Sequence, residues 1–265
     1  PSPWKVIAAF SAKGSSESSQ VRRGSPPLKI ESRIVPVSGS CPKNTVSSMA
    51  YCAIISQCAG GYSFYKDCRS DRVTRWLPEN WHFDRPGRYL YLKEGTDVWS
   101  ASYQPVRTRP DHFEARHGLG YTTIETRHKG IVCAATYFVP VHDPCEVWLF
   151  TLTNRSARTR ALELFPYAEW QLGDYHLELR YRNIMNLYNR VWWDTRLKAI
   201  LAKKTAAWGD LNIKPFEDHA FFASSLPVAG HATIKGTFVG RYNTEEQPEM
   251  LLNGPFKSES FCSGE

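Results

Sequence analysis

The sequence predicts an all-β fold, an antiparallel sandwich or barrel built from many short strands. Three observations support this prediction. Residues 131–140 form an apolar run that ends at a proline, residues 146–153 alternate polar and apolar side chains, and turn-forming residues recur at intervals of roughly 8–12 residues. No stretch shows the periodicity of a long amphipathic helix. With 265 residues, 42% of them hydrophobic, the chain can bury a sizeable core in one large domain or two small ones.

The middle of the chain carries the clearest strand pattern. The alternating segment 146–153 places three side chains on one face: Val147, Leu149 and Thr151. A polar turn at 154–158 leads into a second alternating segment at 160–167. Because two strands joined by a short polar loop commonly pair with each other, these segments are predicted to form a hairpin.

The ends of the chain differ from its middle. Two further short strands are predicted at 220–225 and 231–240, and the segment 197–202 is the best candidate for a short helix. Residues 11–48 are rich in Ser, Gly, Pro and Lys, and such a composition buries too little apolar surface to offset its ordering entropy. We therefore predict a low-complexity or disordered arm over 1–48 and a β-domain over 49–265.

Charge and hydropathy limit the kinds of partner that the chain is expected to bind. The formal net charge is +7, but the basic residues are scattered and no block of five or six like charges occurs. A solvated surface with some anion-binding arginines explains this pattern better than a nucleic-acid site does. No apolar run approaches the roughly 18 residues that span a membrane, and the first residues lack a convincing signal peptide.

The seven cysteines form an odd set at irregular spacing. This favours a reducing, cytoplasmic compartment over a disulfide framework, and no pair has the two-residue gap of a zinc ribbon. Cys133, within an apolar strand pattern, is expected to be a small core residue. The histidines show no metal-binding spacing either, so no metal site is predicted.

Three blocks rich in aromatic residues, glycine and arginine stand out. They are Gly-Gly-Tyr-Ser-Phe-Tyr-Lys-Asp at 60–67, Asp-Arg-Pro-Gly-Arg-Tyr-Leu-Tyr at 84–91 and Arg-His-Gly-Leu-Gly-Tyr-Thr at 116–122. Four shorter segments between and after these blocks belong to the same pattern: Trp99-Ser100, 104–108, 138–140 and Glu169-Trp170. Together they resemble the N-terminal domain of the inverting glycoside phosphorylases related to cellobiose phosphorylase (glycoside hydrolase family 94, formerly glycosyltransferase family 36). The resemblance covers residues 50–265.

The resemblance implies an antiparallel β-super-sandwich, galactose mutarotase-like, with a strand at 197–202. It also implies a parent enzyme that cleaves a β-linked di- or oligosaccharide with inorganic phosphate and releases a sugar 1-phosphate with inversion. Such an enzyme works as a homodimer without cofactor or metal. Its catalytic Asp lies in a helical barrel later in the chain, to which nothing here corresponds, so no catalytic residue is predicted. The sequence is therefore expected to be a fragment whose sandwich is incomplete at the C-terminal end.

The best ligand candidate is Arg190, in the segment Asn-Leu-Tyr-Asn-Arg. Members close to cellobiose phosphorylase carry Asn-Phe-Gln-Arg-Asn there, and the resemblance implies that this Arg reaches the acceptor-sugar subsite. A planar guanidinium can bond two adjacent hydroxyls at once. Asn189 and Tyr188 are weaker candidates beside it. The alternative is a surface salt bridge from Arg190 to Asp194.

Arg116 and His117 form a second candidate pair, in a turn bounded by glycines. These side chains can reach a ligand, or they can satisfy backbone carbonyls at a domain junction. The aromatic-rich composition of the motif blocks suits sugars, whose C–H faces pack on rings while their hydroxyls bind Arg and carboxylates.

Three other interpretations stay open. The chain can be a free-standing carbohydrate-binding module, part of a cyclic β-glucan synthase, which carries the same domain, or an inactive truncated product. A free module would bind saccharide without any further domain.

Overall fold

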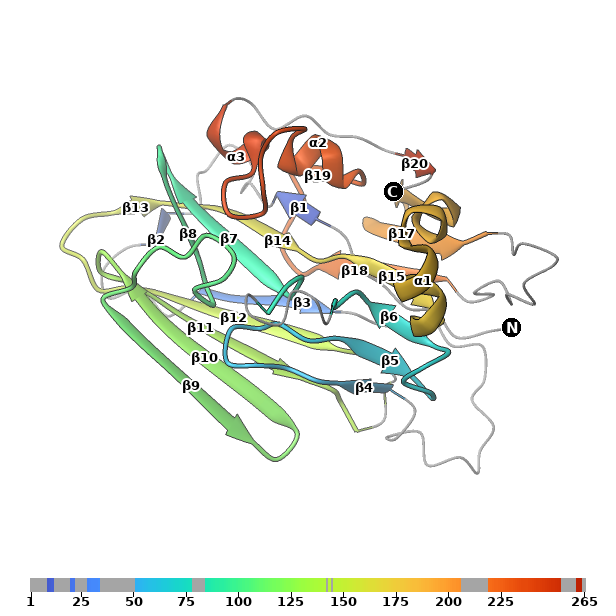
Figure 1. Ribbon diagram of the computed structural model, residues 1–265. Coiled ribbons are helices and arrows are strands. Elements are labelled where there is room, and N and C mark those ends of the chain that lie inside the picture. The colour runs from blue at the N-terminus through green and yellow to red at the C-terminus, as the bar shows by residue number, and fades with distance from the viewer. Residues whose placement is uncertain are drawn as a thin grey trace.

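The computed structural model is built mainly from antiparallel sheets (Figure 1). It describes residues 9–11, 20–21, 28–33, 51–77, 84–141, 143, 145–205, 219–253 and 261–263. Two layers of sheet enclose the core, and a few short helices lie at one end. This architecture confirms the predicted all-β fold.

Among the described residues, nine strands form the larger sheet. Their order across the sheet is β20 (Phe261–Ser263), β16 (Asn189–Asp194), β17 (Ala199–Lys204), β18 (Ala220–Ser224), β3 (Leu28–Arg33), β12 (Val147–Asn154), β11 (Ile131–Phe138), β10 (Tyr121–His128) and β9 (His112–Gly118). Every neighbouring pair is antiparallel.

The second layer consists of two shorter sheets. One has the order β14 (Glu163–Tyr167), β7 (Tyr89–Glu94), β8 (Asp97–Ser100), and the other β15 (Trp170–Gly173), β6 (Arg72–Thr74), β5 (Ser63–Tyr65), β4 (Tyr51–Ala53). Two small ladders pair β1 (Ala9–Ser11) with β19 (Gly230–Ala232) and β2 (Gln20–Val21) with β13 (Arg160–Ala161). The helical elements are α1 (Tyr175–Met185), η3 (Asn186–Tyr188), α2 (Lys235–Val239) and α3 (Glu249–Leu252).

The core follows from the two-residue period of the strands. Ile124, Ala135 and Phe150 lie opposite one another on β10, β11 and β12, and all three are fully buried. Cys133 is buried on the same face, as predicted. From the other layer, Leu92 and other apolar side chains complete one continuous cluster.

One ion pair lies inside this core. The guanidinium of Arg88, the residue before β7, contacts the carboxylate of Glu146, the residue before β12. Both side chains are excluded from solvent, at 1% and 0% exposure. Glu146 also accepts a hydrogen bond from Trp148 Nε1 at 2.8 Å. Arg88 belongs to the second motif block, and this arginine serves the fold by linking the two layers.

The predicted hairpin between 146–153 and 160–167 is wrong. The first strand, β12, pairs with β11 on one side and β3 on the other, so neither edge is left for the second. The returning segment enters the opposite layer, where β14 pairs with β7. Val147, Leu149 and Thr151 do share a face of β12, but the deeper face carries Trp148, Phe150 and Leu152.

Two predictions around the helices also need correction. Residues 231–240 do not form one strand, because the chain leaves β19 after Ala232 and turns into α2. Helix α1 was not anticipated, since its inward face buries a charged residue, Glu178, rather than an apolar stripe. Its start is fixed by Asp174, which accepts a hydrogen bond from the Leu177 N–H at 3.0 Å. The segment 197–202 adopts the strand alternative, because β17 begins at Ala199.

Most of the predicted arm, 1–48, lies outside the described residues. Within it, however, three short segments are paired strands, and β3 fills the position between β12 and β18. The sequence of β3, Leu-Lys-Ile-Glu-Ser-Arg, has the alternation of a strand. A composition averaged over the whole arm conceals so short a signal.

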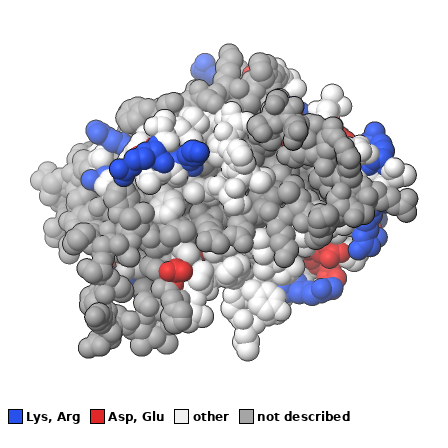
Figure 2. Space-filling model, turned by 180° about the vertical axis from the view of Figure 1, so that it is seen from behind, with Lys and Arg blue, Asp and Glu red and all other residues white. Residues whose placement is uncertain are grey.

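In the view of Figure 2, the described Lys and Arg side chains lie in separate groups. Among the described helices, none is both long and apolar enough to cross a bilayer.

Candidate functional site

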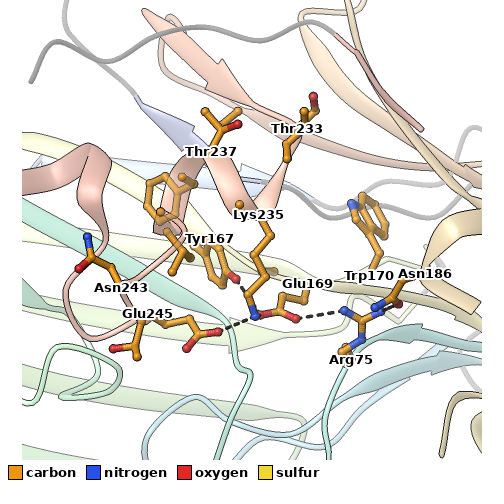
Figure 3. Close-up of a pocket in the computed structure, with 18 of the residues that line it drawn as sticks. Arg75, Tyr167, Glu169, Trp170, Asn186, Thr233, Lys235, Thr237, Asn243 and Glu245 are labelled. Carbon is orange, nitrogen blue, oxygen red and sulfur yellow. Dashed lines mark hydrogen bonds and ion pairs between the residues drawn. The ribbon is translucent and has the colours of Figure 1, made fainter. Parts of the chain in front are cut away.

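A cavity of about 930 Å³ opens where the second layer meets the helical end of the molecule. Its walls come from the segment between β14 and β15, from β19 and α2, and from the loop after α2. Asn183 of α1, Asn186 of η3 and Arg75 after β6 close one side. Figure 3 shows Lys235 reaching between Glu169 and Glu245, with Arg75 on the far side of Glu169.

Glu169 is the centre of the polar contacts in this cavity. Its carboxylate meets Lys235 Nζ at 2.7 Å and Arg75 Nη1 at 3.2 Å. It also accepts a hydrogen bond from the Tyr167 hydroxyl at 2.7 Å. Three side chains therefore bind this carboxylate, and the residue is only 7% exposed.

The contacts of Glu169 belong to a longer alternating series, which we call the charge row. It consists of Glu178, Arg75, Glu169, Lys235, Glu245, Arg85, Glu246 and Arg107. At the α1 end Arg75 Nε lies 2.8 Å from Glu178, and at the loop end Arg107 lies 3.3 Å from Glu246. Four cations face four carboxylates, so the row carries no excess charge.

The charge row keeps its central carboxylate ionised. Burial alone would raise the pKa of Glu169, but Lys235 and Arg75 outweigh it and lower that pKa to about 2. Burial would likewise lower the pKa of Lys235, whereas Glu169 and Glu245 raise it. Near neutral pH neither group is placed to exchange a proton with a substrate, so the row suits positioning and recognition rather than acid–base catalysis.

The structure separates the predicted residues Tyr188, Asn189 and Arg190. Arg190 is exposed on β16 and forms no ion pair with a described residue. The alternative, an ion pair between Arg190 and Asp194, does not occur among the described contacts. The Asp194 side chain instead accepts a hydrogen bond from the Leu197 N–H at 2.8 Å. Asn189 points the other way and is buried, while half-buried Tyr188 ends η3.

Asn189 lies directly opposite Lys204 of β17. Both side chains are buried, at 1% and 3% exposure, and burial lowers the pKa of the Lys204 ammonium to about 8. Neither amide atom of Asn189 has a hydrogen-bond partner in the described part of the chain. These two polar groups are therefore part of the interior beneath Arg190, not of the solvent-facing surface.

Arg116 and His117 lie on β9, at the opposite edge of the nine-stranded sheet. Arg116 binds the Glu114 carboxylate through two hydrogen bonds, of 2.8 and 2.6 Å. His117 Nδ1 lies 3.0 Å from the Thr122 hydroxyl, so its contact is across the hairpin. Seven strand spacings of about 4.8 Å place this edge on the order of 30 Å from β16.

The predicted residues thus form two distant groups, and neither lines the cavity. The sequence pointed to Glu169-Trp170 only as a motif, and it gave no signal for Arg75, Lys235 or Glu245. Glu169 meets partners 94 and 66 positions away, and no local pattern announces such pairs. Across the described ranges, no cluster of three or more His, Cys, Asp or Glu side chains is placed to hold a metal ion.

Comparison with known proteins identifies the fold family. Residues 40–263 match the family described as Glycosyl hydrolase 94, supersandwich domain. N,N'-diacetylchitobiose phosphorylase of Vibrio furnissii is 32% identical over 216 residues, which are 80% of this chain and 26% of that protein. Solabiose phosphorylase of Paenibacillus borealis is 31% identical over 170 residues, 63% of this chain and 21% of that protein.

A relative of another kind is the cyclic beta-(1,2)-glucan synthase NdvB of Rhizobium meliloti (strain 1021), 25% identical over 213 residues, 80% of this chain and 7% of that protein. The chain spans about a quarter of the length of the two phosphorylases named above, 26% and 21%. The family match covers most of the chain and agrees with the two-layered antiparallel architecture. The chain therefore belongs to the glycosyl hydrolase 94 supersandwich family.

Proposed function

We propose that residues 49–265 form the carbohydrate-binding supersandwich domain of an inverting glycoside phosphorylase. The complete enzyme would cleave a β-linked di- or oligosaccharide with inorganic phosphate and release a sugar 1-phosphate. The observation that carries this proposal is the family match over residues 40–263, together with relatives whose names are those of disaccharide phosphorylases. A homodimeric, cytoplasmic enzyme completes the proposal, supported by the family resemblance and the odd number of cysteines.

The domain would recognise sugar rather than break the glycosidic bond. Inverting phosphorolysis needs one carboxylic acid, because phosphate itself attacks the anomeric carbon from the opposite face. Glu169 is unsuited to that task, since its pKa of about 2 leaves it ionised at neutral pH. We place the acid outside this domain, in the helical barrel that the family resemblance implies.

The test is a chimeric protein, called the joined protein below. In it, this chain replaces the segment of the Vibrio furnissii phosphorylase that it matches. The joined protein is expected to form sugar 1-phosphate from N,N'-diacetylchitobiose and phosphate, whereas this chain alone forms none. Release of sugar 1-phosphate by the purified chain alone would contradict the division of labour proposed here.

In the joined protein, Arg190→Ala is expected to raise the KM for the acceptor sugar about tenfold, measured in the synthetic direction. The reason is the loss of charge-assisted hydrogen bonds from an exposed guanidinium, each worth roughly 1.5–3 kcal/mol. The KM for phosphate, measured in the phosphorolytic direction, should stay unchanged. Arg196→Ala serves as the matched control, since Arg196 is also exposed and lies in the turn after β16. Equal acceptor constants for both variants would remove Arg190 from the acceptor site.

A second candidate function is glycosyl transfer without phosphate, favoured by the similarity to the cyclic glucan synthase. The two functions differ in one requirement. A phosphorylase forms no product without phosphate, whereas a transferase extends or cyclises the glucan in its absence. A free-standing carbohydrate-binding module would bind saccharide and show neither activity.

A further inference from the structure

We propose that the cavity beside the charge row is a binding site for a neutral saccharide, separate from the strand that carries Arg190. This goes beyond the proposed function, because its ligand class is argued from the cavity itself. The volume of about 930 Å³ lies within the roughly 300–1,000 Å³ that small-molecule sites occupy. Neither Arg190 nor Asn189 is among the residues that line it.

The charge row disfavours an ionic ligand at the cavity floor. Lys235 touches two carboxylates, Glu169 at 2.7 Å and Glu245 at 2.5 Å. Arg75 is likewise shared between Glu169 and Glu178. A phosphate bound here would have to displace a carboxylate that already satisfies each cation, and a carboxylate ligand would meet the same obstacle.

Apart from the charge row and Arg241, the polar lining residues include neutral amides and the hydroxyls of Thr233, Thr237 and Thr244. Asn183 is exposed and Asn243 is half-buried, and both line the cavity. Asn186 also lines the cavity, and its Oδ1 accepts a hydrogen bond from Arg75. An amide both donates and accepts, which is what sugar hydroxyls require of a partner.

The amides project from two sides of the cavity. Asn183 and Asn186 belong to α1 and η3, whereas Asn243 follows α2 on the opposite wall. Phe238 and Trp170 also line the cavity, and both side chains are largely buried, at 1% and 6% exposure. Neutral amides and hydroxyls on facing walls, above cations that carboxylates already satisfy, fit a neutral polyhydroxyl ligand.

The rim carries one cation outside the charge row. Arg241 is exposed and lies over the Tyr242 ring, 5.6 Å from its centroid. Arg241 lines the cavity and would attract an anion, whereas a neutral sugar gains nothing from its charge, so phosphate is the discriminating probe.

The experiment titrates the full 265-residue chain with N,N'-diacetylchitobiose, cellobiose and inorganic phosphate in turn. Calorimetry gives the dissociation constant, and amide resonances in ¹H–¹⁵N spectra locate the site. We expect saturable binding of at least one disaccharide, with shifts centred on 232–245 and no competition by phosphate. Asn243→Ala and Asn183→Ala are each expected to raise the dissociation constant of the disaccharide about three- to tenfold, the effect of losing one neutral hydrogen bond.

Asn253→Ala is the matched control, because Asn253 is exposed at the end of α3 and does not line the cavity. The proposal fails if neither disaccharide saturates, if the shifts centre on β16, or if phosphate competes at the cavity. It also fails if the control weakens binding as much as the two cavity variants. If the joined protein is active but the cavity binds no saccharide, the proposed function stands and the cavity proposal fails. If the cavity binds saccharide but the joined protein is inactive, the cavity proposal stands and the proposed function fails.

Discussion

Glu146→Gln is expected to lower the free energy of unfolding by about 3–5 kcal/mol. Arg88 and Glu146 are both enclosed by the core, and the variant would leave the guanidinium charge there without its counter-ion. Removing one member of a buried pair costs far more than the pair contributes as a whole, because the remaining charge has lost its water as well as its partner. The carboxylate also accepts from Trp148 Nε1, so the variant disturbs a second buried contact.

Urea unfolding of the purified variants measures this effect. Glu114→Gln is the control, because Glu114 pairs with an arginine on the exposed strand β9 and should leave the midpoint unchanged. The double variant Arg88→Met/Glu146→Leu should be more stable than Glu146→Gln, since it leaves no unpaired charge. A midpoint for Glu146→Gln equal to that of the control would show that this ion pair does not connect the two layers.

Acid is expected to destabilise the chain by about 3 kcal/mol through Glu169 alone. Lys235 and Arg75 overcome the effect of burial and lower the pKa of Glu169 from its ordinary value of 4.5 to about 2. A carboxylate with a lowered pKa in the folded state contributes stability at pH values above its unfolded pKa. That contribution is lost as the pH falls from about 4.5 towards 2, because only the unfolded chain binds the proton in this range.

The measurement is a series of urea midpoints between pH 7 and pH 2 for the native chain and Glu169→Gln. The variant should be less stable at pH 7 and should lose less stability than the native chain between pH 4.5 and 2. Glu125→Gln, a half-buried position on β10, should keep the native pH profile. If Glu169→Gln follows the native profile instead, Glu169 does not hold the charge row together.

The sequence predicted the fold class because strand alternation is local and the motif blocks are long. It did not predict which strands pair. The loop after β12 looks like a hairpin, but β3 occupies the edge that a hairpin would use, and β3 lies more than a hundred residues earlier. Helix α1 escaped detection for a related reason, since its buried Glu178 is satisfied by an arginine 103 positions away.

The candidate site was predicted only in part. Resemblance selected Arg190, and the structure leaves it exposed, as a ligand contact requires. Resemblance could not show that Asn189 points inward, nor that Arg116 lies at the far edge of the same sheet. The charge row was invisible in the sequence, because its members are spread between positions 75 and 246 and meet only when the segment after β19 packs against the second layer.

The most direct test of the assignment is the rate of sugar 1-phosphate formation by the joined protein. It is compared with the Vibrio furnissii phosphorylase lacking its matched segment, with and without phosphate. We expect phosphate-dependent product from the joined protein and none from the shortened protein or from this chain alone. A joined protein that folds, binds N,N'-diacetylchitobiose and still forms no sugar 1-phosphate would contradict the assignment of this chain as a working phosphorylase domain.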